Sequence, residues 1–511
     1  RRVQFSEIFN NRDFVAGEQT YTNTFDISYY PTEKGPYNSN AATESTSQRW
    51  AGIMRPISVS NFVTSNIEYV EFWMMDPYAD GNALGTNPKL LLQLGNVSED
   101  ILKDGQMQYE NGLPTPSVPS TTTSSNWGTQ PKQPPILYAF SSEGADRTAQ
   151  DVGYDGLSSD QEAALFGNTF VNPVTNVSDP AVDDFVFYMS NSFTGNQASS
   201  LVQRYKYFRG PEGNSQSNSL EVSTQTPDSE DINKDYNLDQ SENYNEYIVN
   251  LDQASLAAGT DNYIVDQKIV QATFQNGQTD DVKWYLFRIP VSDFNNPDKP
   301  DLGGDKDDAI LNNVRFARLI LKGFDQTSTL RFGTMDLVRS DWRKYPRNIA
   351  QYGSTVPDPA TDEGSLVTDN NILEVGSVNI EENALNQPPY VLPPGIDRQI
   401  LSGNAGAQRQ NEASLYMNIK NLPNAQARGV FKNTSLDMRR YKKLKLFVHT
   451  HDPLNRDANI GQIDPKTKFF IRFGSDATDN YYEYEIPLKL TRGFVNMNSA
   501  NADKSIWPDD R

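Results

Sequence analysis

The segment GVFKNTSLDMRRYKKLKLFVHTHDP (residues 429–453), followed by KTKFFIRFGSDATDNYYEYEIPL (residues 466–488), decides the fold class of this chain. A polar loop separates the two segments. Both carry short runs of β-branched and aromatic residues between turn-forming residues, which is typical of β-strands. The sequence therefore predicts a β module in this region.

The same pattern occurs earlier in the chain. Residues 52–77 read GIMRPISVSNFVTSNIEYVEFWMMDP, and residues 89–95 read KLLLQLG. When the two Asp-Pro pairs are aligned, residues 89–95 match 468–474, with a small change in loop length. The counterpart of 481–488 is WYLFRIPV, much later in the first copy. We infer one β module that occurs twice, with a long insertion in its first copy.

These strands predict a mainly β protein with two related, jelly-roll-like β-sandwich modules, because one sheet alone cannot bury both faces of strands such as 67–75. The second module lacks counterparts of the strands expected at 314–324 and 329–343, so we expect it to be incomplete and the sequence to be part of a longer chain. The predicted organisation is an N-terminal extended segment (1–49), a first module (50–350) with an irregular insertion at about 100–280, a linker (351–395) and a second, truncated module (396–511).

The insertion carries two local predictions. SDQE at residues 159–162, followed by AALFG, combines a capping box with a glycine stop and predicts a helix of about two turns. SLVQRYKYFR at residues 200–209 predicts a further strand.

Composition limits the function classes. The chain has 511 residues, 45 Lys and Arg against 66 Asp and Glu, and a net charge of −21. This balance argues against a nucleic-acid partner and is compatible with divalent cations, basic partners or simple solubility. The absence of cysteine excludes disulfides, Cys-ligated zinc, iron–sulfur clusters and thiol catalysis. No P-loop, Rossmann fingerprint, HExxH motif or nucleophile elbow is present, so we expect no enzyme.

One acidic segment has the spacing of a metal site. Oxygen-bearing side chains fall at positions 1, 3, 5, 9 and 12 of a twelve-residue loop, as in an EF-hand calcium site. Tyr236 stands at position 6 in place of the usual Gly, and the flanks lack helical periodicity. The alternative is an acidic loop without a ligand. The candidate calcium ligands are Asp231, Asn233, Asp235, Asp239 and Glu242.

The two histidines offer a weaker candidate. His449 and His451 are two residues apart on an expected strand and so share a face, which would allow a two-histidine metal clip. The repeat places Trp73 and Met75 at the same positions, so we expect both histidines to have a packing role.

Seven longer stretches together extend over nearly the whole chain. They are YYPTEKGPYN (29–38), RWAGIMRP (49–56), IEYVEFWMMDP (67–77), EDINKDYNLDQSENY (230–244), LRFGTMDLVRSDWR (330–343), VNIEENALNQPPYVLPPGIDRQ (378–399) and SLDMRRYKKLKLFVH (435–449). These stretches resemble the SprA (Sov) family of the Bacteroidetes.

This resemblance implies a segment of a very large outer-membrane β-barrel, the translocon of the type 9 secretion system, which also serves gliding motility. The family passes folded cargo proteins across the outer membrane. Its partners are a PorV-type outer-membrane barrel, a periplasmic plug protein and cargo proteins with C-terminal secretion signals. The family has no known catalytic residues, so none is assigned here.

We expect this segment to lie outside the membrane, because it shows too few lipid-facing strands for a barrel wall. The extracellular side is favoured, since the long insertions of outer-membrane barrels are on that side. The expected role is to shape or gate the pore mouth and to dock partners. The alternative is a calcium-stabilised, carbohydrate-binding β-sandwich pair of a secreted polysaccharide-processing protein.

Overall fold

The computed structural model is mainly β, as predicted. It describes residues 2–33 and 45–100 with short gaps, short stretches between 107 and 146, and residues 159–206, 230–295, 308–349, 372–400, 409–452 and 463–508, again with short gaps. The chain divides into two compact units. We call Thr24–Val338 the sandwich unit, and Arg1–Asn23 with Arg339–Arg511 the terminal unit.

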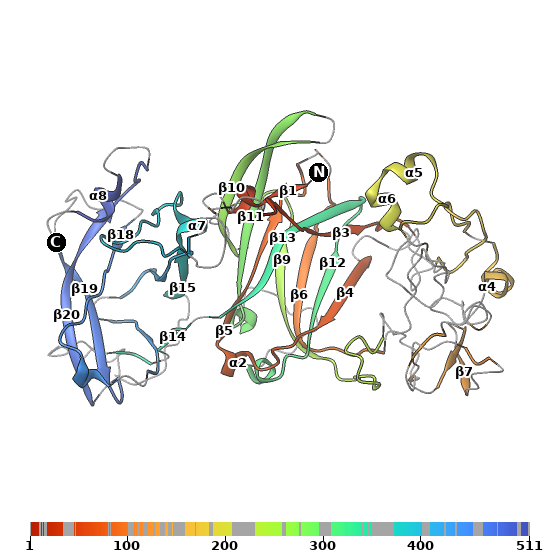
Figure 1. Ribbon diagram of the computed structural model, residues 1–511. Coiled ribbons are helices and arrows are strands. Elements are labelled where there is room, and N and C mark those ends of the chain that lie inside the picture. Colours follow the sequence, from red (N-terminus) through yellow and green to blue (C-terminus); the bar gives the residue numbers. More distant parts are fainter. Residues whose placement is uncertain are drawn as a thin grey trace. The chain divides into compact units, whose positions relative to one another are not determined.

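The sandwich unit contains two large sheets, the small two-stranded sheet β7-β8 and short helices (Figure 1). Its strands are β3 (Phe25–Tyr29), β4 (Trp50–Pro56), β5 (Ile67–Met75), β6 (Lys89–Asn96), β7 (Thr122–Ser125), β8 (Gly128–Pro131), β9 (Asn243–Asn250), β10 (Ile264–Thr273), β11 (Thr279–Pro290), β12 (Phe316–Lys322) and β13 (Ser328–Arg339). Its helices are α2 (Phe62–Ser65), α4 (Ser159–Phe166), α5 (Gly195–Ser199), α6 (Leu201–Lys206), and the 3-10 turns η1 (Asp293–Asn295) and η2 (Asp308–Asn312).

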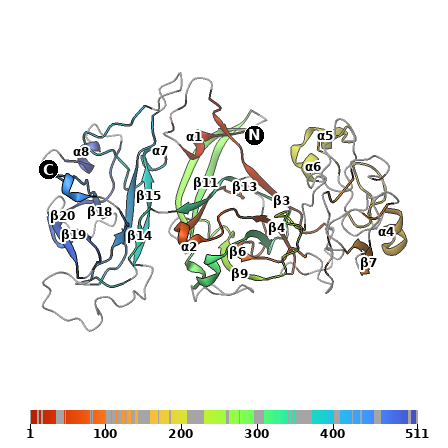
Figure 2. The same cartoon turned by 60° about the horizontal axis from the view of Figure 1, so that its bottom comes forward.

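The strand order is that of a jelly roll. One sheet has the order β10-β11-β5-β13-β3 and the other β4-β12-β6-β9. When β10 is set aside, each sheet keeps four strands, and the chain crosses between the sheets at most connections, as two nested Greek keys require. Figure 2 shows the two layers, with β11, β13 and β3 in one and β4, β6 and β9 in the other. The jelly-roll-like prediction is therefore confirmed for this unit.

The core of the sandwich lies between these sheets. Val70, Phe72 and Met74 of β5 are buried in it, as their alternation along the strand requires. Phe72 stacks on Phe287 of β11 with ring centroids 4.9 Å apart. Trp73, on the opposite face of β5, is also buried, and Lys268 Nζ lies 4.8 Å from its ring centroid. A strand that is apolar on both faces is thus covered on both faces.

The turn between β12 and β13 depends on a glycine. Gly323 has φ +78°, a conformation that favours glycine, and a Cβ there would lie 2.0 Å from the backbone oxygen of Asn87. The backbone of the turn therefore lies in close contact with the backbone of the residues before β6.

In Figure 1 the β10–β11 hairpin extends beyond the other strands of its sheet.

The terminal unit contains smaller sheets. β14 pairs with β17, β15 with β16, and a three-stranded sheet has the order β18-β20-β19. Its elements are β1 (Val3–Gln4), α1 (Phe5–Ile8), β2 (Tyr21–Thr22), β14 (Arg343–Lys344), β15 (Leu373–Asn379), α7 (Ile380–Asn383), β16 (Ala413–Ile419), β17 (Val430–Phe431), η3 (Met438–Arg440), β18 (Thr450–Asp452), β19 (Ile463–Gly474), β20 (Tyr481–Arg492) and α8 (Ala502–Ile506).

The sequence repeat is not reproduced in the strand pairing. β6 and β11 lie in opposite sheets, whereas their counterparts β19 and β20 pair with each other in antiparallel register. The physical reason is the connection. β19 and β20 are joined by the short segment 475–480, which favours a hairpin, while the insertion separates β6 from β11.

The predicted domain boundaries remain predictions, but several strands lie across them. β3 belongs to the stretch predicted as an extended N-terminal segment and β15 to the stretch predicted as a linker, and both take part in sheets. β9 and β10 lie within the predicted insertion of 100–280 and yet join the two sheets of the sandwich. The first part of the predicted linker, 351–371, lies outside the described residues.

The insertion confirms one local prediction and corrects another. The helix predicted from the capping box is α4, Ser159–Phe166. The strand predicted at 200–209 is wrong where it is described, because Leu201–Lys206 forms helix α6. There the Arg204 side chain donates hydrogen bonds to the carbonyl oxygens of Tyr188 and Ala198. These bonds connect helix α6 to the residues that precede it. None of the helices in the described part of the chain has the length and hydropathy of a membrane-spanning segment.

Candidate functional site

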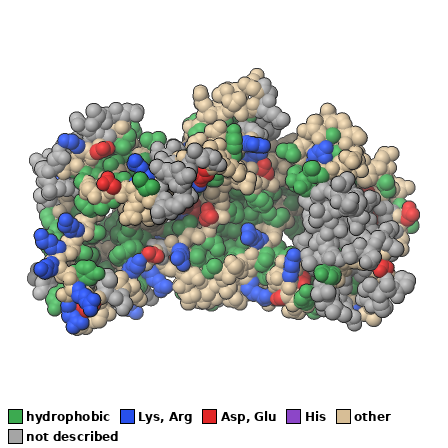
Figure 3. Space-filling model, in the orientation of Figure 1, with side chains coloured by type: hydrophobic (Ala, Val, Ile, Leu, Met, Phe, Trp, Pro, Cys, Tyr) green, Lys and Arg blue, Asp and Glu red, His purple; other side chains and the backbone are tan. Residues whose placement is uncertain are grey.

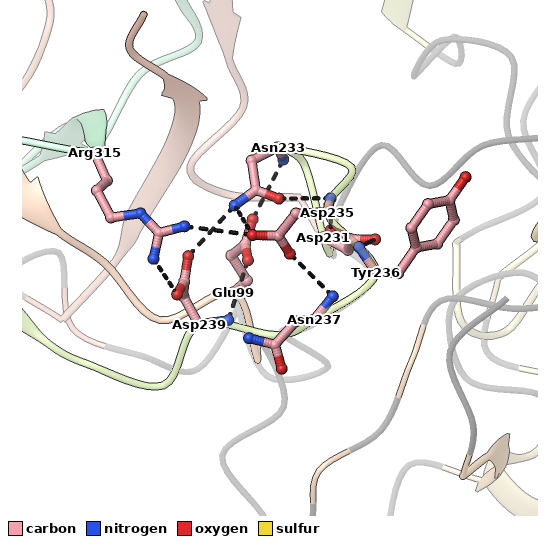
Figure 4. Close-up of polar contacts among 8 residues, drawn as sticks. All are labelled: Glu99, Asp231, Asn233, Asp235, Tyr236, Asn237, Asp239 and Arg315. Atoms are coloured by element: carbon pink, nitrogen blue, oxygen red, sulfur yellow. Dashed lines mark hydrogen bonds and ion pairs between the residues drawn. The ribbon is translucent and has the colours of Figure 1, made fainter. Parts of the chain in front are cut away.

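The acidic loop lies at one end of the four-stranded sheet. β6 pairs with β9 so that Asn96 faces Asn243, and with β12 so that Gly95 faces Phe316. Residues that follow β6 and residues that precede β9 and β12 must therefore meet at the same end of the sheet. This register brings Glu99, the loop 231–242 and Arg315 together (Figure 4).

Asp231 organises the turn of the loop. Its carboxylate accepts hydrogen bonds from the backbone N–H groups of Asp235 and Tyr236, at 3.0 and 3.1 Å. Asp231 is buried, and this burial raises the pKa of its carboxyl group, against the lowering effect of the two N–H donors. Tyr236 adopts φ 64°, the left-handed conformation for which calcium loops use Gly. Its ring points away from the cluster (Figure 4).

Arg315 supplies the positive charge of the cluster. Its guanidinium donates to the carboxylate of Asp239 and, at 3.4 Å, to that of Asp235. Asn233 joins the same group, since its side-chain NH₂ donates to Asp235 at 3.2 Å and to Asp239 at 3.4 Å. Two of the candidate calcium ligands, Asp235 and Asp239, therefore share a protein cation, and a third, Asn233, bridges them.

Glu99, which follows β6, binds the backbone of the loop. It is fully buried, and its carboxylate accepts hydrogen bonds from the backbone N–H groups of Asp239 at 3.1 Å and Asn233 at 3.4 Å. Its own N–H donates to the carbonyl oxygen of Asp239 at 2.8 Å. Burial raises the pKa of the Glu99 carboxyl group against the lowering effect of the two backbone N–H donors, and the negative charges of Asp239 and Asp231 also raise it.

Glu242 does not join the cluster. Its carboxylate pairs with Arg318 of β12, at 3.2 and 3.3 Å, and accepts from the backbone N–H of Ser98 at 3.2 Å. The structure thus brings together Asp231, Asn233, Asp235 and Asp239, and directs the fifth candidate ligand to another partner.

A polar hollow of about 390 Å³ adjoins the loop. Among the described residues, no group of three or more His, Cys, Asp or Glu side chains is arranged to hold a metal ion. Calcium binding at 231–242 stays a prediction, and a calcium ion there would compete with Arg315 for the same carboxylates. The hollow is lined by Pro56, Ile57, Ser58, Ser60, Asn233, Asp235, Asn313, Arg315 and Phe316.

Sequence reasoning missed Glu99, Arg315 and Arg318. Each lies far from the loop in the sequence, and each is an ordinary charged residue next to or within a strand. Alternation along β12 predicts a strand that contains Arg318, but it does not predict which strand pairs with β12. The signal for these contacts is therefore the register of the sheet, which is not a local property.

The two histidines pack in the terminal unit. His449 Nε2 lies 3.1 Å from the hydroxyl of Thr491, and its ring contacts that of Trp507 at 5.8 Å between centroids. Burial lowers the pKa of His451. Both histidine side chains are half-buried, as a packing role requires.

Comparison with known proteins gives one family. The family model SprA_N, described as motility related/secretion protein, matches residues 164–511. No curated protein matches the chain. The match extends from helix α4 through β9–β13 of the sandwich unit and continues into the part of the terminal unit that follows β13.

Proposed function

Because this chain belongs to the SprA_N family of motility-related and secretion proteins, we propose that it acts as the extramembrane part of an outer-membrane protein-translocation channel. A motility- or secretion-related role follows from the family. We propose more specifically that the chain is a portion of the type 9 secretion translocon that shapes or gates the pore mouth and docks partners while folded cargo is exported.

The family match is the observation that carries this proposal. The structure supports it in one further respect. The sandwich unit is a closed jelly roll with its own core, which suits a rigid wall or scaffold rather than a lid. The proposed partners are a PorV-type outer-membrane barrel, a periplasmic plug protein and cargo with C-terminal secretion signals.

We propose a structural rather than an enzymatic role. In the acidic cluster the carboxylates are engaged with Arg315 and with backbone N–H groups, so their contacts stabilise the loop. A charged group that acts in catalysis needs access to a substrate in its reactive protonation state.

The test is affinity purification of the tagged parent protein from detergent-solubilised outer membranes, followed by mass spectrometry. We expect a very large chain together with a small barrel partner and C-terminally signalled cargo. Recovery of a modest-sized chain alone would contradict the proposal. Protease accessibility of a tag inserted at an exposed turn, compared between intact and permeabilised cells, tests the extracellular placement.

A carbohydrate-binding sandwich is the second candidate. The specific observation in its favour is the jelly-roll strand order, which lectin domains also use, together with the polar hollow beside the acidic loop. This reading predicts retention of the purified chain on immobilised polysaccharide and loss of retention when Arg315 is replaced by Ala. The translocon reading predicts no retention.

A further inference from the structure

Residues 441–447 (YKKLKLF) lie between η3 and β18 in the terminal unit and belong to none of the described sheets. In the part of the chain that the structure describes, their backbone N–H and C=O groups make no hydrogen bond. Backbone groups of this kind are satisfied in β-proteins by a neighbouring strand. The segment therefore resembles an open edge, available to another chain.

The apolar side chains of this segment are uncovered. The exposed fractions are 64% for Tyr441, 58% for Leu444, 57% for Leu446 and 46% for Phe447. Among the described residues, Phe447 has an aromatic neighbour, Trp507, with ring centroids 5.8 Å apart. Four exposed apolar side chains within seven residues of an unpaired segment are characteristic of an interaction site.

Residues 439–445, which overlap this segment, are strongly basic. They carry five cationic side chains, all exposed, and among the described residues the carboxylate that contacts them is Asp437, 2.8 Å from Arg439 and 3.8 Å from Arg440. This is a positive patch on a chain whose net charge is −21. Figure 3 shows Lys and Arg side chains gathered beside hydrophobic ones on the part that carries β19 and β20. The cations are Arg439, Arg440, Lys442, Lys443 and Lys445.

In the first copy of the module, the matching segment pairs with neighbouring strands. The sequence alignment matches Leu446 and Val448 with Val70 and Phe72 of β5. β5 is an inner strand, hydrogen-bonded to β11 on one side and β13 on the other, and its apolar side chains are buried. The sequence type of 441–449 is therefore competent to form a paired strand.

We propose that residues 439–447 bind an extended acidic segment of another polypeptide by strand addition, in which carboxylates alternate with apolar side chains. Its backbone would pair with that of 441–447, its apolar side chains would cover Leu444 and Leu446, and its carboxylates would meet Lys443 and Lys445. An anionic lipid surface satisfies the charges but not the backbone groups, so the unpaired backbone favours a peptide. This inference refines the docking role and rests on the proposed function only for its biological setting.

The test uses the purified chain of residues 1–511 and a fluorescent peptide of about eight residues in which Glu alternates with Val, the length of a typical strand. Fluorescence anisotropy measures its Kd. Two further peptides serve as controls: one has Lys in place of Glu, and the other keeps the sequence but carries N-methyl groups on alternate amides, which removes backbone hydrogen bonding on one edge. We expect binding of the Glu peptide, weakened about tenfold or more by N-methylation, and no binding of the Lys peptide.

Chain variants locate the site. Lys443→Glu together with Lys445→Glu should weaken binding about tenfold or more, since both contacts become repulsive. The matched control, Lys132→Glu with Lys420→Glu, makes the same charge change at two other exposed lysines and should leave the Kd unchanged. All four positions are exposed, so the fold should persist, and circular dichroism checks that it does.

Three results would overturn the inference. Equal binding of the N-methylated peptide would show attraction by charge alone, without strand addition. Equal loss in both charge-reversal pairs would show a diffuse electrostatic effect. Failure to bind the peptide, with binding to phosphatidylglycerol vesicles instead, would identify a lipid surface. None of these experiments involves secretion, so their failure leaves the translocation proposal to its own test.

Discussion

The charge of Arg315 holds two carboxylates of the loop 231–242 together, while Glu99 holds the loop's backbone. Arg315 directly precedes β12 and Glu99 follows the end of β6, so the loop is tied to the ends of two strands of one sheet. Whether the loop also binds a metal ion depends on how far Arg315 already neutralises its carboxylates. One prediction tests calcium binding, and a second tests the buried carboxyl group of Glu99.

Calcium binding is tested by chelation. If the loop binds calcium, EDTA should lower the Tm of the chain, because an ion that binds only the folded state stabilises it. Asp235→Ala should remove the difference between the chelated and calcium-loaded chain, and Arg315→Gln should increase the affinity for calcium by removing the competing cation. Arg55→Ala, at an exposed position on β4, is the control. No shift with chelator would contradict the calcium prediction.

The raised pKa of Glu99 predicts a pH dependence of stability. The folded-state pKa lies above the ordinary value of 4.5, so the folded state holds the proton more tightly than the unfolded state does. The contribution of Glu99 is therefore most favourable below 4.5 and is lost as pH rises through the raised pKa. Glu99→Gln removes this dependence.

Urea unfolding from about pH 4 to about pH 7 measures it. The unfolding free energy of the wild type minus that of Glu99→Gln should decrease as pH rises, and other titrating groups cancel in this difference. Asp280→Asn, at an exposed position on β11, is the matched control. A difference that is flat with pH would mean that burial does not dominate at Glu99.

At the scale of elements, turns and strand pairs carry the stability of the sandwich. Two glycines with nearly equal φ separate two physical effects. Gly81 has φ +77° with nothing within 4 Å of a Cβ, whereas at Gly323, with φ +78°, a Cβ would lie 2.0 Å from the backbone oxygen of Asn87. The first position tests backbone conformation alone, and the second adds a close approach.

Replacing each glycine by Ala should separate the effects. In both variants the free energy of unfolding should fall by about 1 kcal/mol, because a positive φ is unfavourable for Ala. Gly323→Ala should lose about 1–3 kcal/mol more, since the backbone of Asn87 has to move. Chemical denaturation measures both values. Equal decreases in unfolding free energy would show that the turn accommodates the Cβ of residue 323 without further destabilisation.

The stacked pair across β5 and β11 predicts a large effect in the core. Phe72 and Phe287 are both buried, and Phe72 also contacts Phe332 of β13. Phe72→Ala should lower the unfolding free energy by about 3–5 kcal/mol. Trp50→Ala, on β4 with 62% of its surface exposed, should change it by less than about 0.5 kcal/mol. Comparable losses would contradict the assigned core.

At the scale of the whole molecule, the division into two units has a physical basis. Every residue of the main hydrophobic core cluster lies within Thr24–Val338. Among the described residues of the terminal unit few apolar side chains are buried, and several aromatic ones are exposed, including Tyr482 at 87% and Tyr484 at 68%. We therefore expect the two units to differ in intrinsic stability.

A fragment of residues 24–338 should fold by itself, because it contains both sheets and the whole core cluster. The expected result is a single cooperative thermal transition and a β-type circular dichroism spectrum. The same fragment with Phe72→Ala should have a lower Tm, which shows that the transition reports the core. A fragment without a cooperative transition would mean that the sandwich requires the rest of the chain.

Local sequence determined much of this protein. Alternation predicted the strands and the mainly β class, the capping box predicted helix α4, and the aspartate spacing marked the loop 231–242. These signals are local, since they depend on which side chains share a face and on which residues favour a turn. For the same reason the helix α6 was misread, because a short segment with mixed apolar spacing fits either element.

The tertiary structure alone decided which strands are neighbours, because hydrogen-bond partners are chosen by the whole sheet and leave no mark in a single strand. It placed Glu99 and Arg315 against the loop, directed Glu242 to Arg318, and paired β19 with β20 although their counterparts lie in opposite sheets. It also left residues 441–447 unpaired with any strand in the described part of the chain, although the matching residues of β5 lie between two strands.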